Sequence, residues 1–91
     1  GLMQWAFAKS GILLPRTAAA QYGVGTHVSR DQLQPGDMVF WASNLSDPRT
    51  IHHVALYIGN NQIIAAPYTG TVVQIESMYW QGYFGATRVV S

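Results

Sequence analysis

The sequence predicts an α+β fold in which N-terminal helices pack on one side of an antiparallel β-sheet. Apolar residues recur at helical spacing near the N-terminus, and from residue 38 onward they form short alternating runs separated by turn residues. The chain of 91 residues is 48% hydrophobic, which is enough for one hydrophobic core. We therefore expect a single domain over residues 1–91, with two helices followed by strands arranged as a meander.

Two helices are predicted near the N-terminus. Residues 2–10 carry an apolar stripe at spacings of three and four, and Gly11 suits a left-handed C-cap. Residues 17–22 begin with Thr17, which can cap a helix, and continue with alanines, which favour one. Gly23 then ends this second, shorter helix.

Five segments predict strands because they combine β-branched, aromatic or aliphatic residues with flanking turn signals. They are residues 38–41, 53–59, 62–66, 71–75 and 86–90. Asn60 and Asn61 predict a hairpin turn because asparagine tolerates positive φ. The polar residues 25–34 and 43–50 predict irregular connections. Residues 77–85 form an interrupted aromatic segment that covers a core edge or lines a cleft.

The segment 53–59 is the strongest strand signal and carries the candidate catalytic side chain. Successive side chains of a strand point to opposite faces. The aliphatic face comprises Val54, Leu56 and Ile58, and the other face comprises His53, Ala55 and Tyr57. Imidazole is the side chain whose unperturbed pKa lies near neutrality, so His53 is a candidate general base; the alternative is a surface or structural histidine.

Metal binding is not predicted. His52 and His53 are adjacent, so alternation places them on opposite sides of a strand, where they cannot share an ion. The remaining histidine is His27, and the sequence contains no cysteine. The absence of cysteine also excludes disulfides and a cysteine nucleophile within these 91 residues. No cofactor is implied.

The charge pattern gives no sign of a nucleic-acid surface. The net charge is +1, and the five basic residues are scattered along the chain. No apolar run is long enough to span a membrane, and no signal peptide opens the chain. Arg16 is interpreted as a solvated surface charge rather than a substrate ligand. Asp37 follows Pro35-Gly36, so we expect it to bond the backbone of that turn rather than act in catalysis.

Four segments of the sequence are informative when taken together. They are Gly1-Leu2-Met3-Gln4-Trp5-Ala6-Phe7, Leu14-Pro15-Arg16-Thr17 with Gln21, Leu33-Gln34-Pro35-Gly36-Asp37-Met38-Val39-Phe40, and His53-Val54-Ala55-Leu56-Tyr57-Ile58-Gly59-Asn60. In this combination they resemble the NlpC/P60 family of bacterial cysteine peptidases, which cut peptidoglycan stem peptides. They cover essentially the whole chain in order. The resemblance implies a reduced papain-like fold, with a cysteine at the start of a helix packed against an antiparallel sheet that carries the catalytic histidine.

The resemblance places this histidine at His53 and the nucleophile in an Asp-Cys-Ser-Gly motif whose glycine is Gly1. The cysteine would then lie two residues before this chain. Independently, an apolar helical pattern starts at Leu2 with no capping residue before it. We therefore expect that the chain was cut within a domain. Ser10 cannot replace the cysteine because it lies at the wrong end of the helix.

The family's third catalytic position, usually a polar residue, falls on Ala65, which cannot orient an imidazole by hydrogen bond. A two-residue hairpin loop would pair Leu56 with Ala65, on the face away from His53. A bulged three-residue loop would pair Tyr57 with Ala65, on the histidine side, as the family's geometry requires. Candidates to orient His53 instead are a backbone carbonyl, a water molecule, Gln62 and Gln74.

Three hypotheses follow. The first is a peptidoglycan stem-peptide hydrolase whose complete form uses His53 as general base; this chain alone would be inactive. The resemblance further implies a secreted or cell-wall-associated bacterial protein with peptidoglycan stem peptides as partners. The second is a catalytically inactive NlpC/P60-like binding or scaffold module. The third is an unrelated aromatic-rich α+β domain, which a sheet that keeps His53 away from the first helix would favour.

Overall fold

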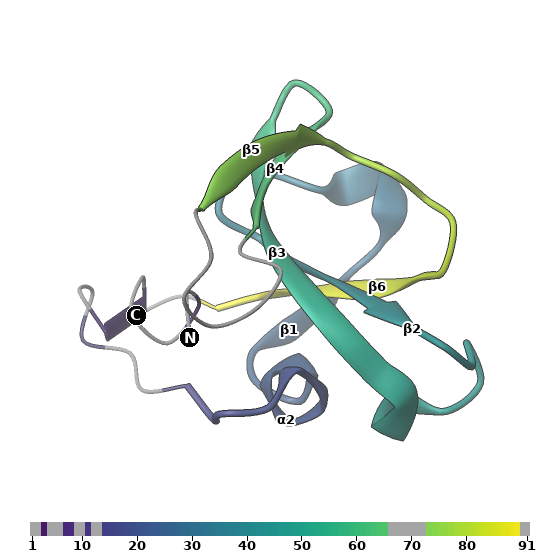
Figure 1. Ribbon diagram of the computed structural model, residues 1–91. Coiled ribbons are helices and arrows are strands. Elements are labelled where there is room, and N and C mark those ends of the chain that lie inside the picture. The colour runs from purple at the N-terminus through teal and green to yellow at the C-terminus, as the bar shows by residue number, and fades with distance from the viewer. Residues whose placement is uncertain (1–2, 4–6, 9–10, 12–13, 66–72, 90–91) are drawn as a thin grey trace.

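The computed structural model describes residues 3, 7–8, 11, 14–65 and 73–89. Its centre is a six-stranded antiparallel sheet with the strand order β1-β6-β2-β3-β4-β5 (Figure 1). The strands are β1 (Thr26–Val28), β2 (Met38–Ala42), β3 (Ile51–Gly59), β4 (Gln62–Ala65), β5 (Gln74–Ser77) and β6 (Tyr83–Arg88). The helical elements are α2 (Ala18–Tyr22) and two 3-10 turns, η1 (Arg30–Gln32) and η2 (Pro48–Thr50). The α+β class and the antiparallel sheet are therefore confirmed.

The end of the first helix and both ends of α2 lie at residues that the sequence indicates. Met3, Phe7 and Ala8 are helical, and the rest of the predicted helix 2–10 lies outside the described residues. Gly11 has a φ of 81° and donates its N–H to the Ala8 carbonyl at 3.0 Å, as expected of a left-handed C-cap. In α2, the Thr17 hydroxyl accepts a hydrogen bond from the Ala20 N–H at 3.1 Å and so caps the helix.

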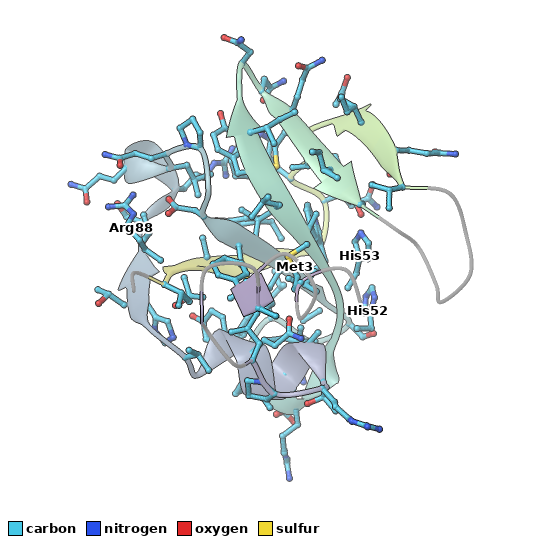
Figure 2. All side chains as sticks on the ribbon, turned by 90° about the vertical axis from the view of Figure 1, so that its left-hand side faces the viewer. Met3, His52, His53 and Arg88 are labelled. Atoms are coloured by element: carbon cyan, nitrogen blue, oxygen red, sulfur yellow. The ribbon has the colours of Figure 1, made fainter. Side chains whose placement is uncertain are left out.

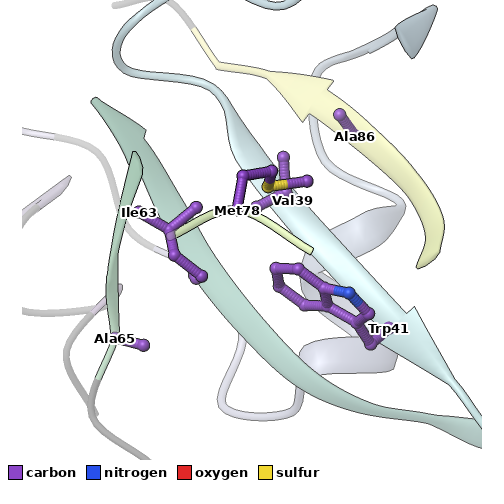
Figure 3. Packing of buried hydrophobic residues seen from close by; sticks show 7 residues of the cluster. Val39, Trp41, Ile63, Ala65, Met78 and Ala86 are labelled. Carbon is purple, nitrogen blue, oxygen red and sulfur yellow. The ribbon is translucent and has the colours of Figure 1, made fainter. Parts of the chain in front are cut away.

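The sheet buries apolar side chains on both faces. On the helix face, the buried cluster contacts α2 and the N-terminal residues; it comprises Met3, Leu14, Met38, Phe40, Ala42 and Ile51. We call the opposite side the histidine face. Its buried cluster comprises Val39, Trp41, Ala55, Ile63, Ala65, Met78 and Ala86 (Figure 3). Val54 and Leu56 pack against the first cluster and Tyr57 against the second, so the predicted alternation along β3 is confirmed over these residues.

The register of the hairpin between β3 and β4 differs from both predicted registers. Asn60 and Asn61 have φ values of 53° and 60°, which confirms the predicted turn. Gly59 pairs with Gln62, but a bulge follows in β3, so that Tyr57 pairs with Ile63. Both predicted pairings of Ala65 are therefore wrong. The bulge nevertheless brings Ala65 to the histidine face, as the family's geometry requires, because it moves every later β4 residue to the other side of the ladder.

Several strand boundaries and the simple meander are wrong. Strand β5 runs from Gln74 to Ser77 instead of ending at residue 75, and β6 starts at Tyr83, within the interrupted aromatic segment. Strand β1 occupies part of the polar segment 25–34. Strands β2 to β5 follow one another in order, but β6 returns between β1 and β2. Residues 66 and 71–72 of the predicted strands lie outside the described residues.

A buried ion pair fixes β6 to the turn before β2. The Arg88 guanidinium donates to both carboxylate oxygens of Asp37, at 2.8 and 2.9 Å. Asp37 also accepts a hydrogen bond from the Gln34 N–H at 2.9 Å, which confirms its predicted role in the turn. Its side chain is 2% exposed, so the carboxylate needs this charged partner. The sequence analysis did not pair Asp37 with Arg88, because 51 residues separate them.

Candidate functional site

His53 lies near the start of β3, opposite Trp41 of β2. The centres of the two rings are 5.2 Å apart, and their planes are tilted by 35°. Trp41 is almost fully buried and His53 half-buried, so the indole supports one side of an imidazole that keeps access to solvent. None of the described residues makes a hydrogen bond with the imidazole of His53. The ring contact that the structure shows for His53 is the one with Trp41.

Tyr79, which follows β5, packs on the same tryptophan as His53. Its ring stacks on Trp41 with centres 4.6 Å apart, and its carbonyl accepts a hydrogen bond from the Trp41 indole N–H at 3.2 Å. Met78 is buried in the cluster of the histidine face, and Trp80 and Tyr83 pack against it. The predicted role of this aromatic segment in covering a core edge is confirmed. Its specific placement over Trp41 was not predicted.

The surroundings of His53 favour the neutral imidazole. Burial lowers the pKa of His53 below its ordinary value of 6.5, because a charged ring loses solvation there. The negative charge of Glu76 acts in the opposite direction and raises the pKa, whereas His52 lowers it further. Burial dominates. A neutral imidazole can accept a proton from an acidic neighbour, which is what a general base requires.

This pKa shift predicts a pH dependence of stability. Below pH 6.5 the unfolded chain binds a proton at His53 that the folded protein binds only at lower pH. We therefore expect the free energy of unfolding to fall as the pH drops from 7.5 through the ordinary histidine range. His53→Gln should show a shallower fall, measured by urea unfolding at pH 7.5 and 5.5. An unchanged slope would contradict a depressed pKa at His53.

His52 does not follow strict strand alternation. Trp41 pairs with His53 and Ala42 pairs with Ile51, so His52 is the extra residue of a β-bulge. The prediction that alternation alone separates the two histidines is therefore wrong, and both lie at the same side of the molecule in Figure 2. Within the described part of the chain, no group of three or more histidine, aspartate or glutamate residues is arranged to hold a metal ion.

The structure separates the two glutamines that were candidates to orient His53 in place of Ala65. Ala65 is fully buried on the histidine face and pairs with Gln74 of β5. Residues directly opposite each other share a face, so Gln74 lies on the side of His53. Gln62 pairs with Gly59 and lies three residues before Ala65 on β4. Because side chains alternate along a strand, Gln62 is on the other face. Of the two glutamines, only Gln74 remains a candidate to orient His53.

Met3 shares a buried cluster with a residue of the strand that carries His53. Met3 is 3% exposed and belongs to the same buried cluster as Ile51, two residues before His53. Figure 2 shows Met3 and the two histidines in the same region of the molecule and Arg88 away from them. Met3 therefore packs with a residue of the strand that carries His53, which argues against the hypothesis of an unrelated α+β domain. Arg16 is exposed, consistent with a surface charge.

No helix among the described residues has the length and apolar character needed to cross a bilayer.

The sequence profile of the NlpC/P60 family matches residues 1–90 of this chain. Among curated proteins, the chain is 38% identical to "Gamma-DL-glutamyl hydrolase" of Bacillus subtilis, over the whole chain and 23% of that protein. It is 39% identical to "Peptidoglycan endopeptidase RipA" of Mycolicibacterium smegmatis, over 90% of the chain and 16% of that protein. The chain therefore spans less than a quarter of the length of these two relatives.

Solved structures agree with this match. The P60 domain of an antigen from M. avium paratuberculosis superposes with a TM-score of 0.83 at 37% identity, covering 99% of this chain and 62% of that one. RipD of Mycobacterium tuberculosis, described as a non-catalytic NlpC/p60 domain protein adapted to peptidoglycan binding, superposes with a TM-score of 0.82 at 34% identity, covering 99% of this chain and 64% of that one. The match over nearly all of its residues shows that this chain belongs to the NlpC/P60 family.

Proposed function

We propose that the complete protein is a cysteine endopeptidase that hydrolyses peptidoglycan stem peptides, with His53 as its general base. The observation that carries this proposal is the position of His53: a half-buried imidazole on β3, the strand whose Ile51 shares a buried cluster with Met3. Two curated relatives are named as a gamma-DL-glutamyl hydrolase and a peptidoglycan endopeptidase. The substrate would be an amide bond such as the D-glutamyl–diaminopimelate linkage.

The nucleophile would be a cysteine two residues before Gly1, at the start of the helix that includes Met3 and Phe7. A helix N-terminus lowers the pKa of a thiol because the helix dipole and the free N–H groups favour the thiolate. His53 would take the thiol proton and return it to the leaving amine once the thiolate has attacked the carbonyl. The burial that depresses the pKa of His53 keeps it neutral and ready to accept that proton. No cofactor takes part in this scheme.

The chain itself contains no cysteine, so we expect residues 1–91 alone to be inactive. The complete protein would act outside the cytoplasm, at the cell wall, where its substrate lies. The test is digestion of purified muropeptides by the complete protein, with products identified by mass spectrometry. Cleavage of a stem-peptide amide is expected, and prior alkylation of the protein with iodoacetamide should abolish it. Cleavage that survives alkylation would contradict a thiol mechanism.

A second candidate is a peptidoglycan-binding module without catalytic activity. The alanine at position 65 favours it, because the third position then offers no group to the imidazole. RipD shows that the fold exists in a protein described as non-catalytic. This candidate predicts that the complete protein co-sediments with insoluble peptidoglycan and releases no product. The muropeptide digestion described above separates the two candidates directly.

A further inference from the structure

We propose that Tyr79 is a specificity-determining residue whose exposed ring receives the side chain of the diamino acid that follows the scissile amide. This inference rests on the proposed function, because it names the part of a stem peptide that the same site contacts. The exposed large apolar or aromatic side chains among the described residues are Leu45, Val73, Ile75 and Tyr79. Of these, Tyr79 is the one whose ring stacks on Trp41, which also packs against His53.

Hydrogen bonds on both sides hold the backbone of Tyr79 in place. The N–H of Met78 donates to the Asn61 carbonyl at 2.8 Å, which ties this segment to the hairpin between β3 and β4. The Tyr79 carbonyl accepts a hydrogen bond from the indole N–H of Trp41 at 3.2 Å. Met78 is itself buried in the same cluster as Trp41 (Figure 3). Tyr79 is therefore positioned before a ligand arrives, so little conformational freedom is lost on binding.

The ring of Tyr79 is covered on one side and open to solvent elsewhere. Its plane lies at 21° to that of Trp41, with ring centres 4.6 Å apart, so one face of Tyr79 is used in stacking. Trp41 is only 2% exposed, whereas Tyr79 is 42% exposed. The side of the ring that faces away from Trp41 accounts for this exposure. An open aromatic face binds apolar groups because both surfaces are then removed from water.

Tyr79 lies close enough to His53 to contact a residue next to the reacting bond. Trp41 is the common neighbour of both rings, with centres 5.2 Å from His53 and 4.6 Å from Tyr79. The rings of His53 and Tyr79 are therefore within about 10 Å of each other, a length that an extended peptide spans with about three residues. A peptide with its scissile amide at His53 can thus place a neighbouring side chain on Tyr79.

The chemistry of the proposed substrate points to the diamino acid. In a γ-linked D-glutamyl–diaminopimelate bond, the methylene groups of the glutamyl residue are part of the peptide backbone. Diaminopimelate instead carries a free side chain of several methylene groups that ends in charged groups. Such a chain can lie across an aromatic ring while its charged end stays in water. Next to the scissile bond, the diamino acid therefore supplies the apolar length that the open face of Tyr79 accommodates.

The test is a double-mutant cycle between Tyr79 and the ligand. Two synthetic stem peptides are compared, one with diaminopimelate after the glutamyl residue and one with alanine there. Their dissociation constants for the complete protein are measured by calorimetry, with any cysteine at the proposed position replaced by serine so that no turnover occurs. Tyr79→Ala should weaken binding of the diaminopimelate peptide about tenfold, as expected when one or two methylene groups lose their contact, and that of the alanine peptide less than about twofold. Tyr79→Phe keeps the ring and should bind both peptides as the parent does.

The matched control is Ile75→Ala. Ile75 is 63% exposed and lies on β5, just before the segment that carries Tyr79. It pairs with Ile64, which pairs with Leu56, so it lies on the helix face, away from Trp41. Its replacement removes an exposed apolar side chain from the same part of the sheet and should leave the affinity for both peptides unchanged.

The outcomes separate this inference from the proposed function. Equal weakening of both peptides in Tyr79→Ala would overturn the inference, since Tyr79 would then only support Trp41. Unchanged binding of both peptides, or the same selective loss in Ile75→Ala, would also overturn it while the proposed function stands. If the parent protein binds neither peptide and cleaves no muropeptide, the proposed function fails, and the role of Tyr79 fails with it.

Discussion

Replacing His53 with alanine should abolish hydrolysis of stem peptides by the complete protein. Loss of the general base of a catalytic triad typically lowers the rate by about 10⁴-fold or more, because the nucleophile can no longer transfer its proton. The ring of His53 is half-buried against Trp41 without a hydrogen bond to any described residue, so its removal breaks no hydrogen-bond network. We therefore expect a folded, inactive protein, measured by the initial rate of muropeptide cleavage and by circular dichroism.

The matched control is His27→Ala. His27 lies on β1, which β6 and β2 separate from β3, and its side chain is exposed. Its loss should leave the rate within a few-fold of the parent, because the residue contacts Tyr22 and not the site. Retained cleavage in His53→Ala, or equal loss in both variants, would defeat the assignment of His53 as the base.

Replacing Phe40 with alanine should cost the domain about 3–5 kcal/mol of unfolding free energy. Phe40 is fully buried at the middle of β2, and its ring meets that of Tyr22 from α2 edge to face, with centres 5.2 Å apart. Alanine would leave a cavity in the cluster that contains Met3 and against which α2 packs, so contacts on both sides of the cavity would be lost. A small domain has only about 5–15 kcal/mol of stability in total, so this is a large fraction.

Native-state hydrogen exchange of the β2 and β3 amides measures this loss, because it reports on these strands whatever else the complete protein contains. Leu45→Ala removes an aliphatic side chain that is 59% exposed and should change exchange by less than about 0.5 kcal/mol. If Phe40→Ala lowered the unfolding free energy as little as Leu45→Ala is expected to, the cluster on the helix face would contribute little to stability.

Local pattern in the sequence was sufficient for the elements whose apolar residues follow one period. Alternation along β3 identified the two faces of the strand, and Asn60-Asn61 identified the hairpin, because side-chain period and positive φ are properties of neighbouring residues. Strand β1 was missed because it has no such local pattern: Thr26 and His27 are exposed polar residues, and the strand forms through backbone pairing with β6. The residues around Thr26 in the sequence do not indicate that β6 is its partner.

The site shows the same division between local and distant information. His53 could be proposed from its strand and from the resemblance, whereas its surroundings depend on two bulges that no residue pattern reveals. The bulge at His52 interrupts the alternation from which His52 and His53 were predicted to point to opposite sides of the strand. The bulge before Gly59 decided which face Ala65 occupies.

The return of β6 to a place between β1 and β2 has a consequence for synthesis of the protein. Strand β2 has β3 as its neighbour on one side, but its other neighbour, β6, is the last of the six described strands to be translated. Until Arg88 emerges, the buried carboxylate of Asp37 has no cation, and β1 has no strand to pair with. Such distant pairing is slow because a long loop must close first. The nascent chain would therefore carry an open edge on β2 until β6 has been translated, so the sheet can be completed only once β6 is available.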